Sequence, residues 1–276
     1  MTSRESGPAG IDVTVAHPAR RYNYWLGGKD NYQADRDSGD AVAAVFPTIR
    51  IAAEENRRFL RRAVTYLVRQ AGIRQFLDIG TGIPSAHNTH EVAQSIAPQS
   101  RVVYVDNDPI VLVHARALLT SSPEGMTSYL EADLRDPGTI LGHPGLAQTL
   151  DLSRPVGLML VAILHFLTDD DNPYDAVRKL TGALPAGSHL AISHATGDFI
   201  PARLSSGVDE VIRSENARTR MPFHFRDREE FGRFFDGLEL VPPGIVPIVE
   251  WHNDAAPGQR PSVADTSGYG AVARIR

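Results

Sequence analysis

The architecture of this chain follows from one segment, Phe76-Leu77-Asp78-Ile79-Gly80-Thr81-Gly82-Ile83-Pro84. An apolar strand ends in an acid and then in two glycines separated by one residue. Because glycine has no side chain and adopts positive φ readily, the backbone of such a turn can approach a ligand closely. A helix is expected from Ser85 to Ile96, and its first free N–H groups would face the same point. The segment therefore predicts a ligand site between a strand and a helix.

Asp78 indicates which of two classes of ligand the turn is suited to bind. A nicotinamide site has the pattern Gly-x-Gly-x-x-Gly, which places a pyrophosphate on the helix N-terminus. Here the third position is Ser85, and Asp78 would bring a carboxylate close to that pyrophosphate, which like-charge repulsion disfavours. A ligand with an ammonium and a sulfonium, such as S-adenosylmethionine, suits this acid better. A plain strand–helix turn with a structural acid is the alternative.

Two further acids follow the next two expected strands. A strand at 101–105 ends in Asp106, which is placed to accept hydrogen bonds from ribose hydroxyls. A third strand at 128–132 leads to Asp133, which is suited to accept a hydrogen bond from an adenine amino group. Taken alone, an acid at either position is more often a helix cap or a loop acid. Three acids at three successive strand ends indicate a shared site.

These motifs resemble those of class I S-adenosylmethionine-dependent methyltransferases over roughly residues 50–276. Asp78-x-Gly80-x-Gly82 is similar to their first motif, Asp106 to their ribose acid and Asp133 to their adenine-edge acid, while Leu158–His165 resembles their fourth strand and the following loop. The resemblance implies S-adenosylmethionine as cofactor and S-adenosylhomocysteine as product. The cofactor-binding residues that we expect are Asp78, Gly80, Thr81, Gly82, Asp106, Asn107, Asp133, Leu134, Ala162, Arg21 and Tyr22.

The N-terminal segment narrows the resemblance. The run Ala19-Arg20-Arg21-Tyr22-Asn23-Tyr24-Trp25-Leu26-Gly27-Gly28-Lys29-Asp30-Asn31-Tyr32 is similar to the opening signature of a bacterial methyltransferase family that was long catalogued as a domain of unknown function. The segments 80–84 and 269–274 resemble the same family. The resemblance therefore covers nearly the whole chain. It implies a cofactor and a fold, but it names no methyl acceptor.

Strands and helices are expected to alternate from residue 74 onward, which predicts an α/β fold. We expect a Rossmann-like, mostly parallel, seven-stranded sheet with helices on both faces and an N-terminal helical lid. The expected divisions are a disordered N-terminus at 1–17, a lid at 18–72 and the S-adenosylmethionine-binding domain at 73–276. Further strands are expected near 75–79, 157–162 and 188–193, with a closing antiparallel pair at 238–250 and 269–275.

The aromatic residues of the 20–36 segment suggest a lid over the cofactor, because Tyr22, Tyr24, Trp25 and Tyr32 combine apolar surface with polar tips. Arg21 would meet the methionine carboxylate. Tyr22 would lie close by and is a candidate catalytic residue. The alternative is an arm that only covers apolar surface of the domain.

His165 is the second candidate catalytic residue, because it follows the fourth strand, where it can accept a proton near neutral pH. A loop histidine bonded only to the backbone is the alternative. The pairs His87/His90 and His189/His194 lack a carboxylate cluster at ligand spacing, so no metal is expected.

Composition restricts the classes of partner. The net charge of −5 argues against nucleic acid, and the run Arg57-Arg58 with Arg61-Arg62 is expected to be a solvated helix face paired with Glu54 and Glu55. The chain has no cysteine, so no disulfide is expected, and it has no run of about 20 apolar residues, so no membrane span is expected. Its polar N-terminus does not resemble a secretory signal. We therefore expect a cytoplasmic location.

The expected function is methyl transfer to a small-molecule acceptor, since no basic face or recognition domain suggests a macromolecule. Two other classes stay open. One is a protein that binds S-adenosylmethionine as a sensor without catalysis, and the other is a NAD-dependent oxidoreductase. The sequence predicts neither the acceptor nor the oligomeric state.

Overall fold

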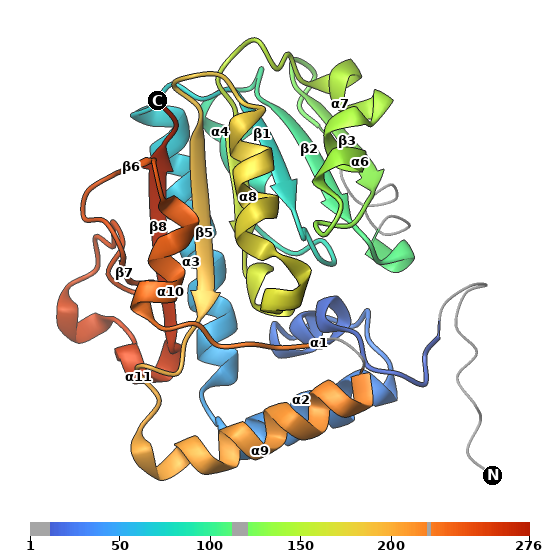
Figure 1. Cartoon of the computed structure of the whole chain (residues 1–276), viewed down its shortest axis with the longest axis vertical. Helices are drawn as coiled ribbons and strands as arrows, with labels where there is room; N and C mark the ends of the chain where they lie inside the picture. The colour runs from blue at the N-terminus through green and yellow to red at the C-terminus, as the bar shows by residue number, and fades with distance from the viewer. Residues whose placement is uncertain (1–11, 112–120, 220–221) are drawn as a thin grey trace.

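A mixed eight-stranded sheet forms the centre of the molecule, with helices on both of its faces (Figure 1). The structure is a computed structural model that describes residues 12–111, 121–219 and 222–276. The strands are β1 (Gln75–Ile79), β2 (Arg101–Asp106), β3 (Met126–Glu131), β4 (Gly157–Val161), β5 (His189–Ala195), β6 (Glu239–Leu240), β7 (Val246–Pro247) and β8 (Gly268–Arg274).

The strands lie in the order β3-β2-β1-β4-β5-β8-β6, with β7 also paired to β8. The first five strands are mutually parallel, and β8 runs antiparallel to β5. Eight strands form rather than the expected seven, because the segment 238–250 is divided at Pro242-Pro243-Gly244 into two short strands. Since the parallel strands share one direction, their carboxyl ends meet at one edge of the sheet.

Several of the α-helices connect one parallel strand to the next and return the chain to the end of the sheet where the strands begin. Those described are α1 (Pro18–Trp25), α2 (Gln33–Val45), α3 (Ile49–Arg69), α4 (Thr89–Ile96), α6 (Pro137–Gly142), α7 (Pro144–Thr149), α8 (Pro173–Gly182), α9 (Ala202–Thr219), α10 (Arg228–Gly232) and α11 (Val263–Thr266). Short 3₁₀ helices are η1 (Leu164–Phe166), η2 (Asp169–Asp171), η3 (Arg233–Phe235) and η4 (Pro257–Gln259).

The helix expected from Ser85 begins four residues later, at Thr89. Asn88 and Glu91 form a capping box there, which satisfies the first free N–H groups and fixes the start of the helix. The N-terminus of α4 therefore does not directly follow the glycine turn.

The two faces of the sheet carry separate apolar cores. On one face α3 and α4 pack against side chains of β1, β2 and β4, and Phe59, Ala63 and Leu67 form the fully buried stripe of α3. On the other face lie α6, α7, α8 and α10. Because α3 packs on the sheet, the expected division at residue 72 is not a boundary in the packing.

A cap of three helices lies across the carboxyl ends of the strands. Figure 1 shows α1 and α2 in this position, with α9 side by side with α2. The sequence pointed to a lid from the N-terminal segment alone, so the contribution of α9 is new. Helix α9 can join the cap because it lies in the long connection between β5 and β8, which begins at the carboxyl end of β5.

The segment expected to be disordered at 1–17 is partly described. Residues 1–11 lie outside the described residues. Residues 12–17 are held in place, since Ala16 is buried, and His17 caps α1 with its Nδ1 atom 2.9 Å from a carboxylate oxygen of Asp108. In the parts of the chain that the structure describes, no helix is long and apolar enough to cross a membrane.

Candidate functional site

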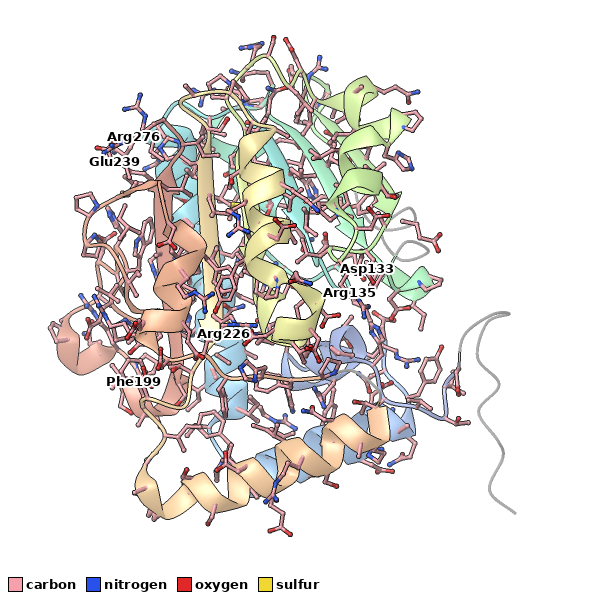
Figure 2. All side chains as sticks on the ribbon, in the orientation of Figure 1. Asp133, Arg135, Phe199, Arg226, Glu239 and Arg276 are labelled. Carbon is pink, nitrogen blue, oxygen red and sulfur yellow. The ribbon has the colours of Figure 1, made fainter. Side chains whose placement is uncertain are left out.

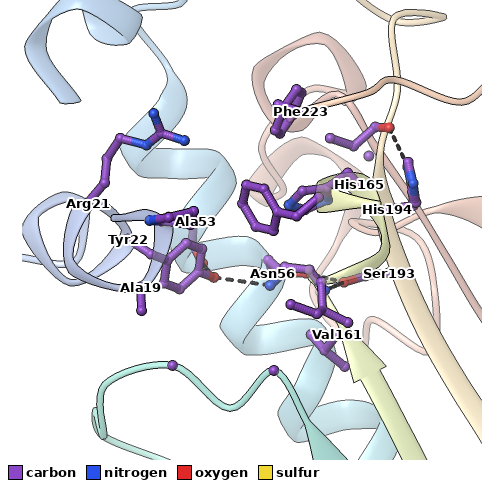
Figure 3. Close-up of a pocket in the computed structure, with 18 of the residues that line it drawn as sticks. Ala19, Arg21, Tyr22, Ala53, Asn56, Val161, His165, Ser193, His194 and Phe223 are labelled. Atoms are coloured by element: carbon purple, nitrogen blue, oxygen red, sulfur yellow. Dashed lines mark hydrogen bonds between the residues drawn. The ribbon is translucent and has the colours of Figure 1, made fainter. Parts of the chain in front are cut away.

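A cavity of about 260 Å³ lies between the carboxyl ends of the strands and the cap of α1, α2 and α9 (Figure 3). All the residues that the sequence suggested for cofactor binding or catalysis line it, although they come from five different parts of the chain. That each of them binds the cofactor or acts in catalysis stays a prediction. Their geometry shows what each one is able to do.

The glycine turn has the expected positive φ angles, +76° at Gly80 and +66° at Gly82. The two glycines are needed for different reasons. A Cβ atom on Gly80 would lie 2.5 Å from the side chain of Ile163, so Gly80 permits close packing against the loop after β4. A Cβ atom on Gly82 would meet nothing within 4 Å. The open approach for a ligand is therefore at Gly82.

Asp78 is a buried carboxyl group at the end of β1. Its Oδ2 atom accepts a hydrogen bond of 2.6 Å from the hydroxyl of Thr89, the first residue of α4. Burial raises the pKa of Asp78 to about 6, and the effect of burial outweighs the lowering by Thr89 and Arg57. A cationic ligand beside this carboxylate would stabilise its charged form.

Asp106 holds the glycine turn against the end of β2. Its Oδ2 atom accepts the N–H of Gly82 at 2.8 Å, and its Oδ1 atom accepts the N–H of Asp108 at 2.9 Å. Burial raises the pKa of Asp106. A carboxylate has about four lone-pair positions, so the two bonds leave capacity for ligand hydroxyls.

Asp133 lies in the loop two residues after β3, where Figure 2 shows it beside Arg135. Arg135 donates to both of its carboxylate oxygens, at 2.9 and 2.7 Å, and the amide of Asn107 donates at 2.8 Å. Burial acts to raise the pKa of Asp133, but these hydrogen bonds outweigh it and lower the pKa to about 2. Asp133 is therefore ionised and already well bonded, while Leu134 beside it offers apolar surface to the cavity.

Tyr22 belongs to a chain of hydrogen bonds that crosses the cavity floor (Figure 3). Its hydroxyl donates to the carbonyl of Ala53 at 2.9 Å and accepts from the amide of Asn56 at 3.0 Å. Asn56 in turn accepts from Ser193 at 2.5 Å, and the Ser193 hydroxyl accepts the N–H of Ala162 at 3.0 Å. Burial raises the pKa of Tyr22. With its proton engaged, Tyr22 is better suited to positioning than to proton transfer.

Ala162 directly follows β4 and lies in the left-handed region, with φ of +56°. Such a conformation is uncommon for a residue other than glycine and costs energy, so the surroundings must impose it. Here the network through Ser193 holds the Ala162 N–H, and the chain turns sharply toward His165.

Arg21 lies between α2 and α9: it donates to the hydroxyl of Ser38 on α2 at 3.0 Å and lies 3.4 Å from a carboxylate oxygen of Glu215 on α9. Both charged side chains are about nine-tenths buried. The sequence suggested the methionine carboxylate as the partner of Arg21. The structure places Glu215 there, a partner 194 residues away that no local pattern could reveal.

The four-arginine run of α3 is only partly a solvated face. Arg58 and Arg61 are exposed, and Arg58 pairs with Glu54 and Glu55 as expected. Arg57 instead lines the cavity, donates to the carbonyl of Ala86 at 3.1 Å, and has a buried Nε atom with no hydrogen-bond partner. Sequence reasoning missed Arg57 as a site residue.

His165 is 8% exposed, and its Nδ1 atom is buried without a hydrogen-bond partner. Its ring lies 4.4 Å from the ring of Phe166 and 4.9 Å from that of Phe223, measured between centroids. Burial and the neighbouring His194, Arg226 and Arg21 keep the pKa of His165 well below its usual value. The ring is therefore neutral near neutral pH.

His194 and Arg226 support this arrangement, and neither was suggested as a site residue. Arg226, labelled in Figure 2, is fully buried. Its guanidinium donates to the carbonyl of Leu164 at 3.0 Å and to that of Leu167 at 2.9 Å. It also lies 3.0 Å from the Nε2 atom of His194. Burial lowers the pKa of His194 to about 3. The guanidinium thus fixes the loop that carries His165.

The two histidine pairs noted in the sequence make other contacts. His90 bonds to the hydroxyl of Tyr104 at 2.8 Å, and His189 to the carbonyl of Gly187 at 3.0 Å. Over residues 12–111, 121–219 and 222–276, no group of three or more His, Asp or Glu residues is arranged to hold a metal ion.

Comparison with known proteins identifies the fold and the family. Residues 4–276 match the family model described as S-adenosyl methyltransferase. A DUF574 family protein from Streptomyces avermitilis is 51% identical, with a TM-score of 0.90 over 96% of this chain and 99% of that one. A candidate methyltransferase from Thermobifida fusca is 38% identical, with a TM-score of 0.85 over 99% and 100% of the two chains.

A more distant structure shares the fold alone. It is an S-adenosylmethionine-dependent methyltransferase from Anabaena variabilis, 15% identical, with a TM-score of 0.50 over 78% of this chain and 84% of that one. Among the curated proteins, none matches this chain.

Proposed function

The chain belongs to the S-adenosyl methyltransferases, and we propose that it transfers the methyl group of S-adenosylmethionine to a small-molecule acceptor held under the cap of α1, α2 and α9. One observation carries the proposal. A single cavity joins the acid-lined strand ends to an apolar chamber beneath the cap. The cofactor side and the chamber are thus connected within the protein, where a small molecule can be enclosed.

The residues at the strand ends fit the cofactor. Asp78 offers a buried carboxylate to the ammonium group, and the free space at Gly82 allows the backbone to approach the methionine portion. Asp106 retains capacity for the ribose hydroxyls, with Asn107 beside it. When bound, the cofactor supplies a methyl group on a sulfonium, which is already a good leaving group.

Much of the acceleration in this chemistry can come from alignment, which contributes roughly 7–11 kcal/mol in favourable systems. The network from Tyr22 to Ala162 gives the cavity a fixed floor, and the contacts of Arg226 fix the loop with His165. We assign positioning to Tyr22 and proton acceptance to His165. Arg57, rather than Arg21, is then the cation best placed to meet a carboxylate of the cofactor, because Arg57 donates to the carbonyl of Ala86 and the amide oxygen of Asn88, whereas Arg21 is already paired with the carboxylate of Glu215.

Calorimetric titration with S-adenosylmethionine, S-adenosylhomocysteine and NAD tests the cofactor site. We expect both adenosyl compounds to bind and NAD to give no signal. Binding of NAD alone would favour an oxidoreductase instead.

Transfer is tested with methyl-tritiated S-adenosylmethionine and a bacterial extract that is separated into macromolecules and small molecules after the reaction. We expect label in the small-molecule fraction. Label in protein or nucleic acid would contradict a small-molecule acceptor. Cofactor binding without transfer to any fraction would favour a sensor.

A further inference from the structure

The chamber beneath the cap has aromatic walls. The rings of Trp25, Phe46, Phe166, Phe223 and Phe225 line the same cavity. Aliphatic side chains of α9, among them those of Val208 and Ile212, complete the wall on the cap side. Such a lining favours a flat, largely apolar ligand, because burial of apolar surface is the main gain available there.

The charges that face the chamber disfavour a cationic acceptor. Among the described residues that line the cavity, the carboxylates are Asp78, Asp106 and Asp133 at the strand ends, and Glu215. Glu215 is the one on the cap side, and it is already paired with Arg21, Arg218 and Ser38. An ammonium group in the chamber would therefore have no free counter-charge. A buried charge without a partner is costly.

A carboxylate acceptor is disfavoured for a related reason. Arg21 is the buried cation on the cap side of the cavity, and Glu215 already supplies its negative partner at 3.4 Å. Arg57 and Arg135 line the cavity at the strand ends, near Asp78 and Asp133, on the side that we assign to the cofactor. A second carboxylate beside Arg21 would meet the like charge of Glu215. Arg226, behind His165, is bonded to backbone carbonyls and to Asp169. The guanidinium groups of Arg21 and Arg226 each already have a carboxylate partner that neutralises the charge, although the Nε atom of each has no hydrogen-bond partner.

One nitrogen of His165 lacks a hydrogen-bond partner in this chamber. Its Nδ1 atom is buried without a partner, and its ring lies against Phe166 and Phe223. A neutral imidazole has one donor and one acceptor nitrogen. A hydroxyl group satisfies either nitrogen, because it both donates and accepts.

On the premise of the proposed function, we infer that the acceptor is an uncharged aromatic or enolic compound whose acidic hydroxyl bonds to Nδ1 of His165. In the transfer, the hydroxyl oxygen forms the bond to the methyl carbon as the carbon–sulfur bond breaks, and the electron pair of that bond stays on sulfur. The hydroxyl proton moves to Nδ1 of His165. The products are the methyl ether and S-adenosylhomocysteine, and the proton is later released to water.

An acidic hydroxyl, rather than an aliphatic alcohol, follows from the basicity of His165. Burial together with His194 of β5, Arg226 before α10 and Arg21 of α1 makes it a weak base. A weak base is effective only for a proton that is already fairly acidic in the transition state. Phenols and enols meet this condition.

Four probes that share the naphthalene ring test the inference by binding to the protein saturated with S-adenosylhomocysteine. They are 2-naphthol, naphthalene, 2-naphthoate and 2-naphthylmethylammonium, titrated calorimetrically at neutral pH. We expect 2-naphthol to bind most tightly, about three- to tenfold tighter than naphthalene, which is the scale of one net hydrogen bond. Tighter binding of the naphthoate or the ammonium compound would overturn the inference, and so would failure of all four to bind.

Variants of His165 locate the hydroxyl contact. In His165→Phe the preference for 2-naphthol over naphthalene should disappear. In His165→Gln the preference should remain, but formation of 2-methoxynaphthalene from 2-naphthol should be lost. His87→Gln, an exposed histidine outside the cavity, is the control and should behave as wild type. An unchanged preference in a folded His165→Phe protein would overturn the contact.

The two proposals fail in different ways. Methylation of an amine or a carboxylate would refute the acceptor class while leaving small-molecule transfer intact. Label confined to macromolecules in the extract experiment would refute the proposed function itself.

Discussion

The Oδ2 atom of Asp106 accepts the backbone N–H of Gly82 at 2.8 Å, so the acid at the end of β2 holds the turn that follows β1. The glycine turn and the acid after β2, two of the motifs of the expected cofactor site, are thus joined by a hydrogen bond. Displacing Asp106 would alter both a proposed ribose contact and the geometry of the glycine turn.

We predict that Asp106→Ala weakens S-adenosylmethionine binding by about 1.5–3 kcal/mol, the scale of a hydrogen bond to a charged group. Calorimetric titration measures the effect, and circular dichroism checks that the variant is folded. Asp151→Ala, which removes an exposed acid outside the cavity, should bind as wild type does. Equal affinity in a folded Asp106→Ala protein would exclude Asp106 from the site.

Cofactor binding should be coupled to the ionisation of Asp78. With a pKa of about 6 in the free protein, this carboxyl is about half protonated at pH 6. A bound ammonium favours the charged form, so affinity should rise between pH 5 and pH 7, with release of about half a proton at pH 6. Titration in two buffers of different ionisation enthalpy measures this release. Asp78→Asn should bind weakly at every pH and release none.

The carboxyl group of Asp78 should also make the free energy of unfolding depend on pH, with stability falling as the pH rises. The pKa of Asp78 is raised in the folded state above its value of about 3.9 in an unfolded chain. Its contribution to stability is therefore full below about pH 4 and is lost as the pH rises through about 6. Urea denaturation of wild type and Asp78→Asn should show their free energies of unfolding diverging over this range in favour of the variant. Parallel curves would mean that the folded pKa is not raised.

The two glycines of the turn should differ in their tolerance of substitution. Gly82→Ala adds only the strain of a positive φ, about 1–2 kcal/mol. Gly80→Ala adds the same strain and a collision with Ile163, so its loss of stability should be larger. The double variant Gly80→Ala/Ile163→Ala should lose less than the sum of the two single changes, because the collision is removed. Additive losses would show that Ile163 does not restrict Gly80.

The ion pair between Arg21 and Glu215 should hold α9 to the N-terminal segment. Removing one partner of a buried pair leaves the other uncompensated, so Glu215→Gln should cost about 3 kcal/mol in the free energy of unfolding. The apolar double replacement Arg21→Met/Glu215→Leu should recover much of this loss. Asp175→Asn, which breaks an exposed pair with Lys179, is the control and should cost less than about 1 kcal/mol. A similarly small effect at Glu215 would show that the pair does not hold the cap.

The strand-end acids and the glycine turn were predictable because their signals are local. Each acid directly follows or ends a short apolar run, and parallel strands bring their carboxyl ends to one edge without any knowledge of side-chain packing. For that reason Asp78, Asp106 and Asp133 meet in one cavity, as the sequence indicated. The start of α4 was misjudged by four residues, since a capping box at Asn88 outweighed the glycine turn as the helix start.

The sequence by itself determined the sheet, the turn and the acids, because periodicity and turn chemistry act between near neighbours. Only the tertiary structure decided that α9 completes the cap, that Arg21 is paired with Glu215, and that Arg57 reaches the cavity. It also decided the character of His165, which becomes a neutral, unpartnered group through burial and the charges of Arg226 and Arg21. Electrostatic surroundings of this kind are assembled from segments far apart in the chain, so no local pattern records them.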